Sequence, residues 1–89
     1  MITRTVVITN ALGMHARAAA RFVHAASAYQ ARVTVTRGAR TVDGKSILGI
    51  LLLAAGRGCD IVVCADGADE AEALDALCAL VGAGFGEGA

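Results

Sequence analysis

The chain has 89 residues, of which 56% are hydrophobic and only 3% aromatic, so we expect one small domain, residues 1–89, with a core of Ala, Val, Leu and Ile. The formal net charge is zero, yet residues 1–45 carry seven of the eight Lys and Arg side chains and residues 46–89 carry seven of the eight acids. Without a basic stripe joined to aromatic rings, nucleic-acid binding is disfavoured, and an acidic protein partner is the better expectation.

The three cysteines, Cys59, Cys64 and Cys78, fit neither a C-x-x-C motif nor a zinc-ligand spacing, so we interpret them as small buried hydrophobic residues. The first residues lack the layout of a signal peptide, and no apolar run is long enough to span a membrane. We therefore expect a cytoplasmic protein without structural disulfides, and neither a metal nor a cofactor is expected.

The first predicted element is a strand over residues 2–9, because β-branched residues dominate this run and Asn10 ends it. Gly13 permits a turn that a β-branched residue would not accept, and an alanine-rich helix is predicted from Ala16 to about Ala28. His15 is therefore placed at the start of a helix, where the first backbone N–H groups point outward.

The start of this helix is predicted to be an anion site. Its first N–H groups have no intrahelical partners, and the helix dipole leaves a partial positive charge there. Arg17 is disfavoured by the same dipole unless a negative group, such as a phosphoryl group, lies between it and the helix end. The dipole also favours neutral imidazole, so His15 is a candidate nucleophile. The alternative is that His15 is merely a poor N-cap and Arg17 a solvated side chain.

The two sides of the predicted helix differ in polarity. Its apolar side is expected to consist of Ala19, Ala20, Phe22, Val23 and Ala26. Its other side carries a basic stripe of Arg17, Arg21 and His24 at positions i, i+4 and i+7. His24 is interpreted as an exposed imidazole at the edge of a partner-binding surface. Its spacing from His15 is not that of two metal ligands on one helix.

Next, alternation predicts a half-buried strand over residues 31–36, with Val33 and Val35 on its buried face, and a short hairpin partner over residues 41–43. Ser46 is a favoured N-cap for a short helix that ends near Gly56. Helical geometry groups Ile50 and Leu53 on one side, and a helix lying on one face of a small sheet cannot bury its other side as well. The remaining apolar residues would form an exposed partner-binding patch, namely Ile47, Leu48, Leu51 and Leu52.

A continuous apolar strand is predicted over residues 61–64, followed by a final helix that begins with a capping pair, Asp69 and Glu72. From Gly82 onward the chain is glycine-rich and is expected to fray, with Phe85 as a candidate tether. The element order βαββαβα predicts the α+β class, an open-faced β-sandwich in which three helices cover one face of a four-stranded antiparallel sheet.

The chain contains the motifs Gly13-Met14-His15-Ala16-Arg17 and Gly44-Lys45-Ser46-Ile47-Leu48-Gly49, with the histidine and the serine thirty-one positions apart. Together these motifs resemble those of the HPr family, the histidine-containing phosphocarriers of the bacterial phosphoenolpyruvate-dependent phosphotransferase system. The resemblance extends over nearly the whole chain and includes the Ala55-Gly56-Arg57-Gly58 turn. It implies a carrier in a phosphoryl relay rather than a stand-alone enzyme.

The resemblance also implies roles for individual residues. His15 would be phosphorylated on Nδ1 by phosphorylated Enzyme I and would pass the group to an EIIA protein, while Arg17 would pair with the phosphoryl oxygens. Ser46 would be the regulatory target of an HPr kinase/phosphorylase. Ala18 departs from the family's usual proline, which predicts a slightly looser first turn with one more N–H donor. A monomer without membrane insertion is expected.

Two other functions remain possible from the sequence. An NPr-like carrier of the nitrogen-related branch has the same G-M-H-A-R site, although the Lys45-Ser46-Ile47 context favours the sugar-type or regulatory HPr. A small binding module without phosphoryl transfer is of another class, and it predicts that a His15→Ala variant retains activity.

Overall fold

The computed structural model describes residues 1–87 of the chain. Its elements follow the order β1 (Ile2–Val7), α1 (Ala16–Ser27), β2 (Arg32–Arg37), β3 (Arg40–Asp43), α2 (Ile47–Leu52), β4 (Asp60–Asp66), α3 (Glu70–Gly82) and a short 3-10 turn, η1 (Gly84–Gly86). The strands form one antiparallel sheet of order β1-β4-β2-β3. This is the predicted open-faced β-sandwich.

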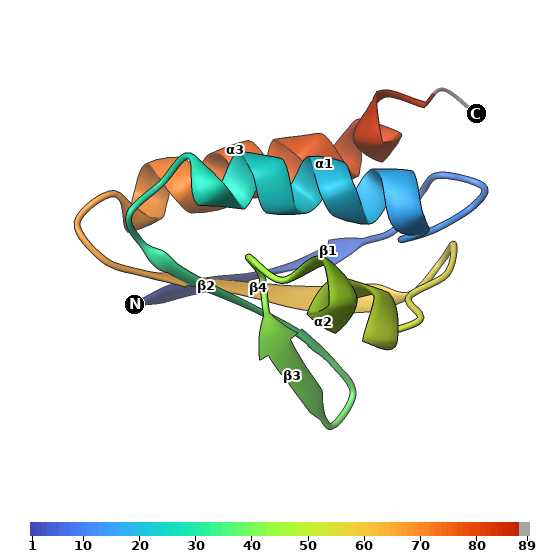
Figure 1. The fold of residues 1–89 in the computed structure, drawn as a ribbon, viewed down its shortest axis with the longest axis horizontal. Helices are drawn as coiled ribbons and strands as arrows, with labels where there is room; N and C mark the ends of the chain where they lie inside the picture. Colours follow the sequence, from blue (N-terminus) through green and yellow to red (C-terminus); the bar gives the residue numbers. More distant parts are fainter. Residues whose placement is uncertain (88–89) are drawn as a thin grey trace.

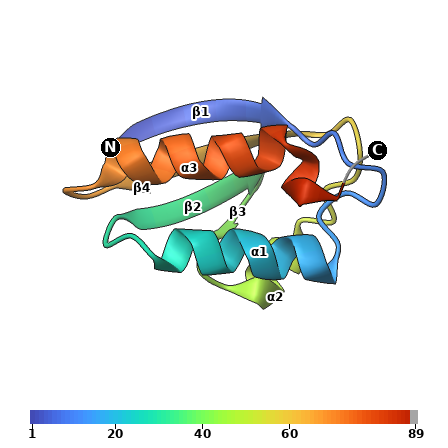
Figure 2. The ribbon, with the colours of Figure 1, turned by 90° about the horizontal axis from the view of Figure 1, so that it is seen from above.

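The two long helices lie side by side and antiparallel over the sheet, so that the start of α1 and the end of α3 are at the same end of the molecule (Figures 1 and 2). The short α2 lies beside α1, next to β3 (Figure 2). The chain's first residue is at the opposite end (Figure 1). None of the helices in residues 1–87 is both long enough and apolar enough to cross a membrane.

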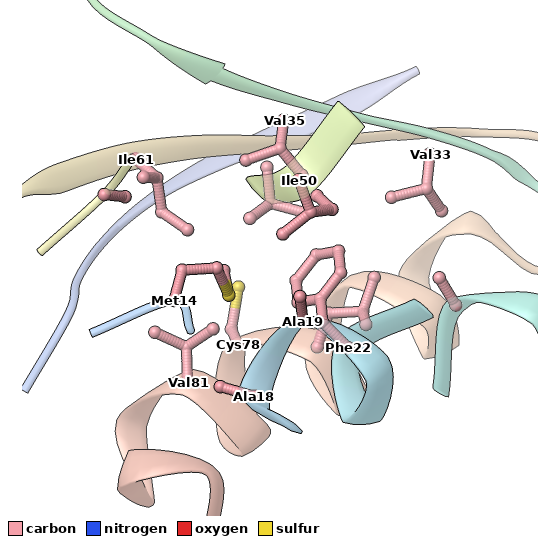
Figure 3. Packing of buried hydrophobic residues seen from close by; sticks show 14 of the residues in the cluster. Met14, Ala18, Ala19, Phe22, Val33, Val35, Ile50, Ile61, Cys78 and Val81 are labelled. Atoms are coloured by element: carbon pink, nitrogen blue, oxygen red, sulfur yellow. The ribbon is translucent and has the colours of Figure 1, made fainter. Parts of the chain in front are cut away.

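The core lies between the sheet and the helices. Strand alternation places one face of β2 and β4 inward, as predicted for Val33 and Val35, and α2 adds Ile50. Figure 3 shows Phe22 and Met14 between the helices and the sheet residues Val35 and Ile61. Burying a side chain of this size stabilises the fold by about 1.5–3 kcal/mol, so the core holds α1 in a defined position over the sheet.

The buried stripe of α1 differs in part from the prediction. Ala18, Ala19, Phe22 and Ala26 are fully buried, whereas Ala20 is exposed. The prediction for Ala20 was wrong because a run of alanines gives little contrast in hydrophobicity with which to orient a helix. Ala18, which the sequence suggested only as an N–H donor, is a core residue.

Asp69 is the N-cap residue of α3, as predicted, but its side chain makes no capping hydrogen bond within residues 1–87, so the predicted capping pair was wrong. The Asp69 carboxylate accepts hydrogen bonds from the backbone N–H groups of Gln30 and Ala31, both at 2.8 Å. These bonds tie the start of α3 to the turn between α1 and β2. The pKa of Asp69 lies below its ordinary value, chiefly because of the hydrogen bond from the Gln30 N–H. Partial burial raises this pKa, and the hydrogen bond from the Ala31 N–H lowers it further.

Residues 84–86 form η1 after the end of α3, so the predicted fraying was wrong for residues 82–87, and residues 88–89 lie outside the described part. Phe85 is fully buried, which confirms the predicted tether. All three cysteines are free thiols. Cys78 is buried, as predicted, but Cys59 and Cys64 are only half-buried, so the prediction was wrong for these two; Cys64 lies on the face of β4 that alternates with the buried Val63 and Ala65.

Candidate functional site

The loop before α1 is fastened to the chain that follows α2. The Met14 N–H donates to the carbonyl oxygen of Ala55 at 2.8 Å, and the Gly13 N–H donates to Asn10 at 3.1 Å. Gly13 has a φ of +64°, and a Cβ there would lie 2.7 Å from the Ala55 carbonyl oxygen and from the Cα of Gly56. Only glycine fits this left-handed turn at this close approach. The backbone that carries His15 therefore has a fixed path.

His15 is the N-cap residue of α1, with an extended backbone conformation (φ −73°, ψ 179°). The first bond of the helix runs from the Ala19 N–H to the His15 carbonyl oxygen at 2.8 Å. The N–H groups of Ala16, Arg17 and Ala18 precede this bond and have no intrahelical acceptor. Within residues 1–87 the His15 side chain makes no capping hydrogen bond to them. This end of α1 therefore presents uncapped donors and the positive end of the helix dipole, as predicted.

The carboxylate of Glu87 lies at this site, although it is 72 positions from His15 in the chain. Its Oε2 atom is 2.5 Å from Nε2 of His15 and 3.5 Å from Nε of Arg17. Its Oε1 atom accepts from Nδ2 of Asn10 at 2.9 Å, and the same Nδ2 donates to the Gly13 carbonyl oxygen at 2.7 Å. The His15 and Glu87 side chains are 23% and 14% exposed. The site thus contains an internal anion beside the predicted nucleophile.

Two opposing influences act on the pKa of the Glu87 carboxylate. Burial raises its pKa most strongly, but hydrogen bonds from Asn10 and His15, together with the charges of His15 and Arg17, leave the pKa below its ordinary value. Glu87 is therefore ionised at neutral pH. As a fixed negative charge it accepts hydrogen bonds and donates none.

The segment that carries Glu87 is held in place by two contacts. The ring of Phe85 is buried, and the Arg21 guanidinium donates to the Phe85 carbonyl oxygen. Phe85 has a φ of +57° between two glycines that also have positive φ. A strained non-glycine residue persists only where its surroundings over-determine it. Here the buried ring and the Arg21 bond do so, and they direct residue 87 back to α1.

Sequence reasoning did not find Glu87 or Asn10 as members of the site. Two signals were available: Glu87 is the only acid after Asp75, and it follows an aromatic residue flanked by glycines. The predicted residues His15 and Arg17 are brought together. Arg21 lies on the same helix but engages Phe85, and His24 is exposed further along α1.

Ser46 lies at the start of α2, and its Oγ accepts from the Gly49 N–H at 3.1 Å, which confirms the predicted N-cap. Ile50 and Leu53 are buried, as predicted. The other four large apolar residues of this segment remain exposed, with Leu48 at 68%, and we call them the α2 patch: Ile47, Leu48, Leu51 and Leu52. Leu12, in the loop before His15, is also exposed.

The α2 patch and the His15 loop belong to neighbouring parts of the structure. Helices α1 and α2 are in contact, and the Met14 bond to Ala55 attaches the His15 loop just after α2 (Figure 2).

In the part of the chain that the structure describes, no three His, Cys, Asp or Glu side chains are grouped as metal ligands. The site's chemistry is that of an imidazole, a guanidinium, a carboxylate and a helix end.

The fold and this site define a class: small α+β proteins that present a histidine at an uncapped helix start. A family model described as "PTS HPr component phosphorylation site" matches residues 2–83. The chain is 47% identical to the phosphocarrier protein HPr of Cupriavidus necator over 88 residues, 99% of each chain. It is 43% identical to the phosphocarrier protein NPr of Shewanella violacea, over 97% of this chain and 94% of that one.

A crystal structure of HPr from Thermoanaerobacter tengcongensis superimposes with a TM-score of 0.96, 39% identity and full coverage of both chains. The chain therefore belongs to the HPr family. It is a phosphocarrier protein of the HPr/NPr type, a component of the phosphotransferase system.

Proposed function

We propose that His15 accepts a phosphoryl group from phosphorylated Enzyme I and passes it to a histidine of an EIIA protein, in the cytoplasm. One observation carries this proposal: His15 is partly exposed at the start of α1, where the first N–H groups are uncapped and Arg17 follows. The family match supports phosphoryl transfer as the chemistry of this site.

In the proposed step, the Nδ1 lone pair of His15 attacks phosphorus. The bond between phosphorus and the donor's nitrogen breaks, and its electron pair stays on the donor imidazole. Such a transition state needs alignment and electrostatic support more than covalent machinery. The Arg17 guanidinium and the N–H groups of the first turn of α1 supply positive charge for the phosphoryl oxygens.

We further propose that partner proteins dock on the α2 patch. Four exposed apolar side chains grouped on one short helix mark a protein-binding surface better than isolated ones would. Arg21 and His24 on α1 would form its charged margin, which favours partners with acidic surfaces and faster encounter at low salt. The carrier would act as a monomer.

Ser46 is proposed as a regulatory phosphorylation site for an HPr kinase/phosphorylase. A phosphate would bring about −1.5 to −2 charges to the start of α2, beside the α2 patch. The helix end tolerates this charge, but an acidic partner would be repelled. The expected effect is weaker docking, with the fold retained.

The choice between the sugar-type and the nitrogen-related branch depends on the acceptor. The chain is nearly as similar to an NPr as to an HPr, with 43% and 47% identity. Incubation of the phosphorylated protein with EIIA proteins of each branch would separate the two, because only the cognate acceptor should be phosphorylated rapidly.

The direct test is incubation with purified Enzyme I and phosphoenolpyruvate, followed by mass measurement of the intact protein. We expect a mass increase of one phosphate that is lost in acid, as for phosphohistidine. The His15→Ala variant should fold and show no increase, whereas Ser46→Ala should be phosphorylated normally. An unmodified wild-type protein, or a phosphorylated His15→Ala variant, would overturn the proposal.

A further inference from the structure

The contact between His15 and Glu87 restricts where the imidazole proton is. Nε2 of His15 and Oε2 of Glu87 are 2.5 Å apart, which requires a proton between them, because two lone pairs at this distance would repel. Glu87 is ionised, as its lowered pKa indicates, so the proton belongs to the imidazole. In a neutral ring, a proton on Nε2 leaves Nδ1 with the free lone pair.

The second carboxylate oxygen fixes the orientation of Glu87. Nδ2 of Asn10 is buried and faces two acceptors, the Gly13 carbonyl oxygen and Oε1 of Glu87. Both of its hydrogens are therefore used, and Oε1 is committed to Asn10. Oε2 is left to face His15, with Arg17 at 3.5 Å. Every donor around the carboxylate thus favours its ionised form.

From these contacts we propose that Glu87 is a positioning residue that holds His15 in the Nε2–H tautomer, and that η1 holds Glu87 in place for this contact. The proposal deepens the proposed function, because it concerns the same histidine. While the new bond between Nδ1 and phosphorus forms, the proton remains on Nε2. The phosphorylated ring then carries a positive charge next to a fixed carboxylate, which stabilises it as a carboxylate stabilises an imidazolium in other histidine sites.

This geometry predicts an unusual effect for Glu87→Gln, which changes shape very little. The glutamine oxygen should replace Oε1 as acceptor for Asn10, so that the glutamine NH2 group faces Nε2 of His15. Nε2 would then accept a hydrogen bond and Nδ1 would carry the proton. A carboxylate-to-amide change beside a catalytic histidine is known to impose the wrong tautomer in this way.

The test has two readouts, of which the first needs no phosphoryl transfer. Nitrogen-15 NMR of the imidazole should show the Nε2–H tautomer of His15 in the wild-type protein, and a shift toward the Nδ1–H tautomer in Glu87→Gln. The second readout is phosphorylation by Enzyme I, which should slow by about 10- to 100-fold in Glu87→Gln. Glu87→Asp, which keeps the charge, should recover part of the rate.

Glu72→Gln is the matched control, because Glu72 is an exposed acid on α3. It should resemble the wild type in both readouts. A wild-type protein in the Nδ1–H tautomer would overturn the proposal, and this measurement decides even if Glu87→Gln does not fold. A folded Glu87→Gln variant with unchanged tautomer or unchanged rate would overturn it as well. Failure of the proposed function would instead appear as an unphosphorylated wild type with its tautomer still measurable.

Discussion

The starts of α1 and α2 have similar backbone roles but opposite chemistry. Both N-cap residues, His15 and Ser46, have extended backbone conformations. The Ser46 hydroxyl satisfies an N–H group of its own helix, whereas the His15 ring turns to Glu87 and leaves the N–H groups of α1 uncapped. A capped helix start is stabilised by its own side chain, whereas an uncapped start keeps its N–H donors available for a bound anion. The difference separates a helix start built for stability from one suited to binding.

The largest expected effect comes from breaking the support of the α1 start with Gly13→Ala. Its Cβ would lie 2.7 Å from backbone atoms of Ala55 and Gly56, in addition to the cost of a positive φ. We expect a loss of about 3 kcal/mol in the free energy of unfolding, measured by urea denaturation. Gly38→Ala is the control, because it has a φ of +58° but open space, and it should lose about 1 kcal/mol. Equal losses would mean that the close approach to residues 55 and 56 is relieved at little cost.

Leu48→Glu changes the surface of α2 without changing its start. Leu48 is exposed, so the fold should be retained, while transfer from Enzyme I should slow by about tenfold if the α2 patch is the docking surface. Ala71→Glu adds the same charge at an exposed position of α3 and should leave transfer unchanged. An unfolded Leu48→Glu variant would place Leu48 in the core, and normal transfer would remove α2 from the interface.

Ser46→Ala makes the α2 start resemble the α1 start by removing its cap. We expect a loss of about 1 kcal/mol in stability, visible as a lower Tm, with phosphorylation of His15 unaffected. Ser27→Ala is the comparison, since Ser27 is exposed at the end of α1 and should change stability by less than about 0.5 kcal/mol. If the two variants have the same stability, the Ser46 bond to Gly49 contributes nothing measurable.

The smallest effect is expected for Ala18→Pro. The Ala18 N–H precedes the first bond of α1, so proline removes no intrahelical hydrogen bond, and stability should change by less than about 1 kcal/mol. Ala20→Pro, two residues later, should cost about 3 kcal/mol because it removes a helical bond. A phosphorylation rate that falls by more than about tenfold in Ala18→Pro would show that the Ala18 N–H binds the phosphoryl group.

Much of the fold was predictable from local patterns. The alternation of Val33 and Val35, the cap at Ser46 and the glycine turn before His15 each depend on neighbouring residues, and each was confirmed. The errors involve contacts between distant parts of the chain. The Asp69 carboxylate binds backbone near residue 30, and Glu87 reaches His15 from the other end of the sequence. Neither partner can be inferred from periodicity, because both depend on how the helices pack.

The strand order has a consequence for how this protein folds as it is synthesised. The hairpin of β2 and β3 joins neighbouring segments, whereas β1 pairs only with β4, with Ile2 opposite Ala65. β1 leaves the ribosome before the other three strands and therefore waits for all of them before its ladder forms. The Met14 bond to Ala55 also requires a distant segment, the one that follows α2 and precedes β4. A nascent chain that stops short of residue 55 thus carries the histidine without the backbone that holds it in place.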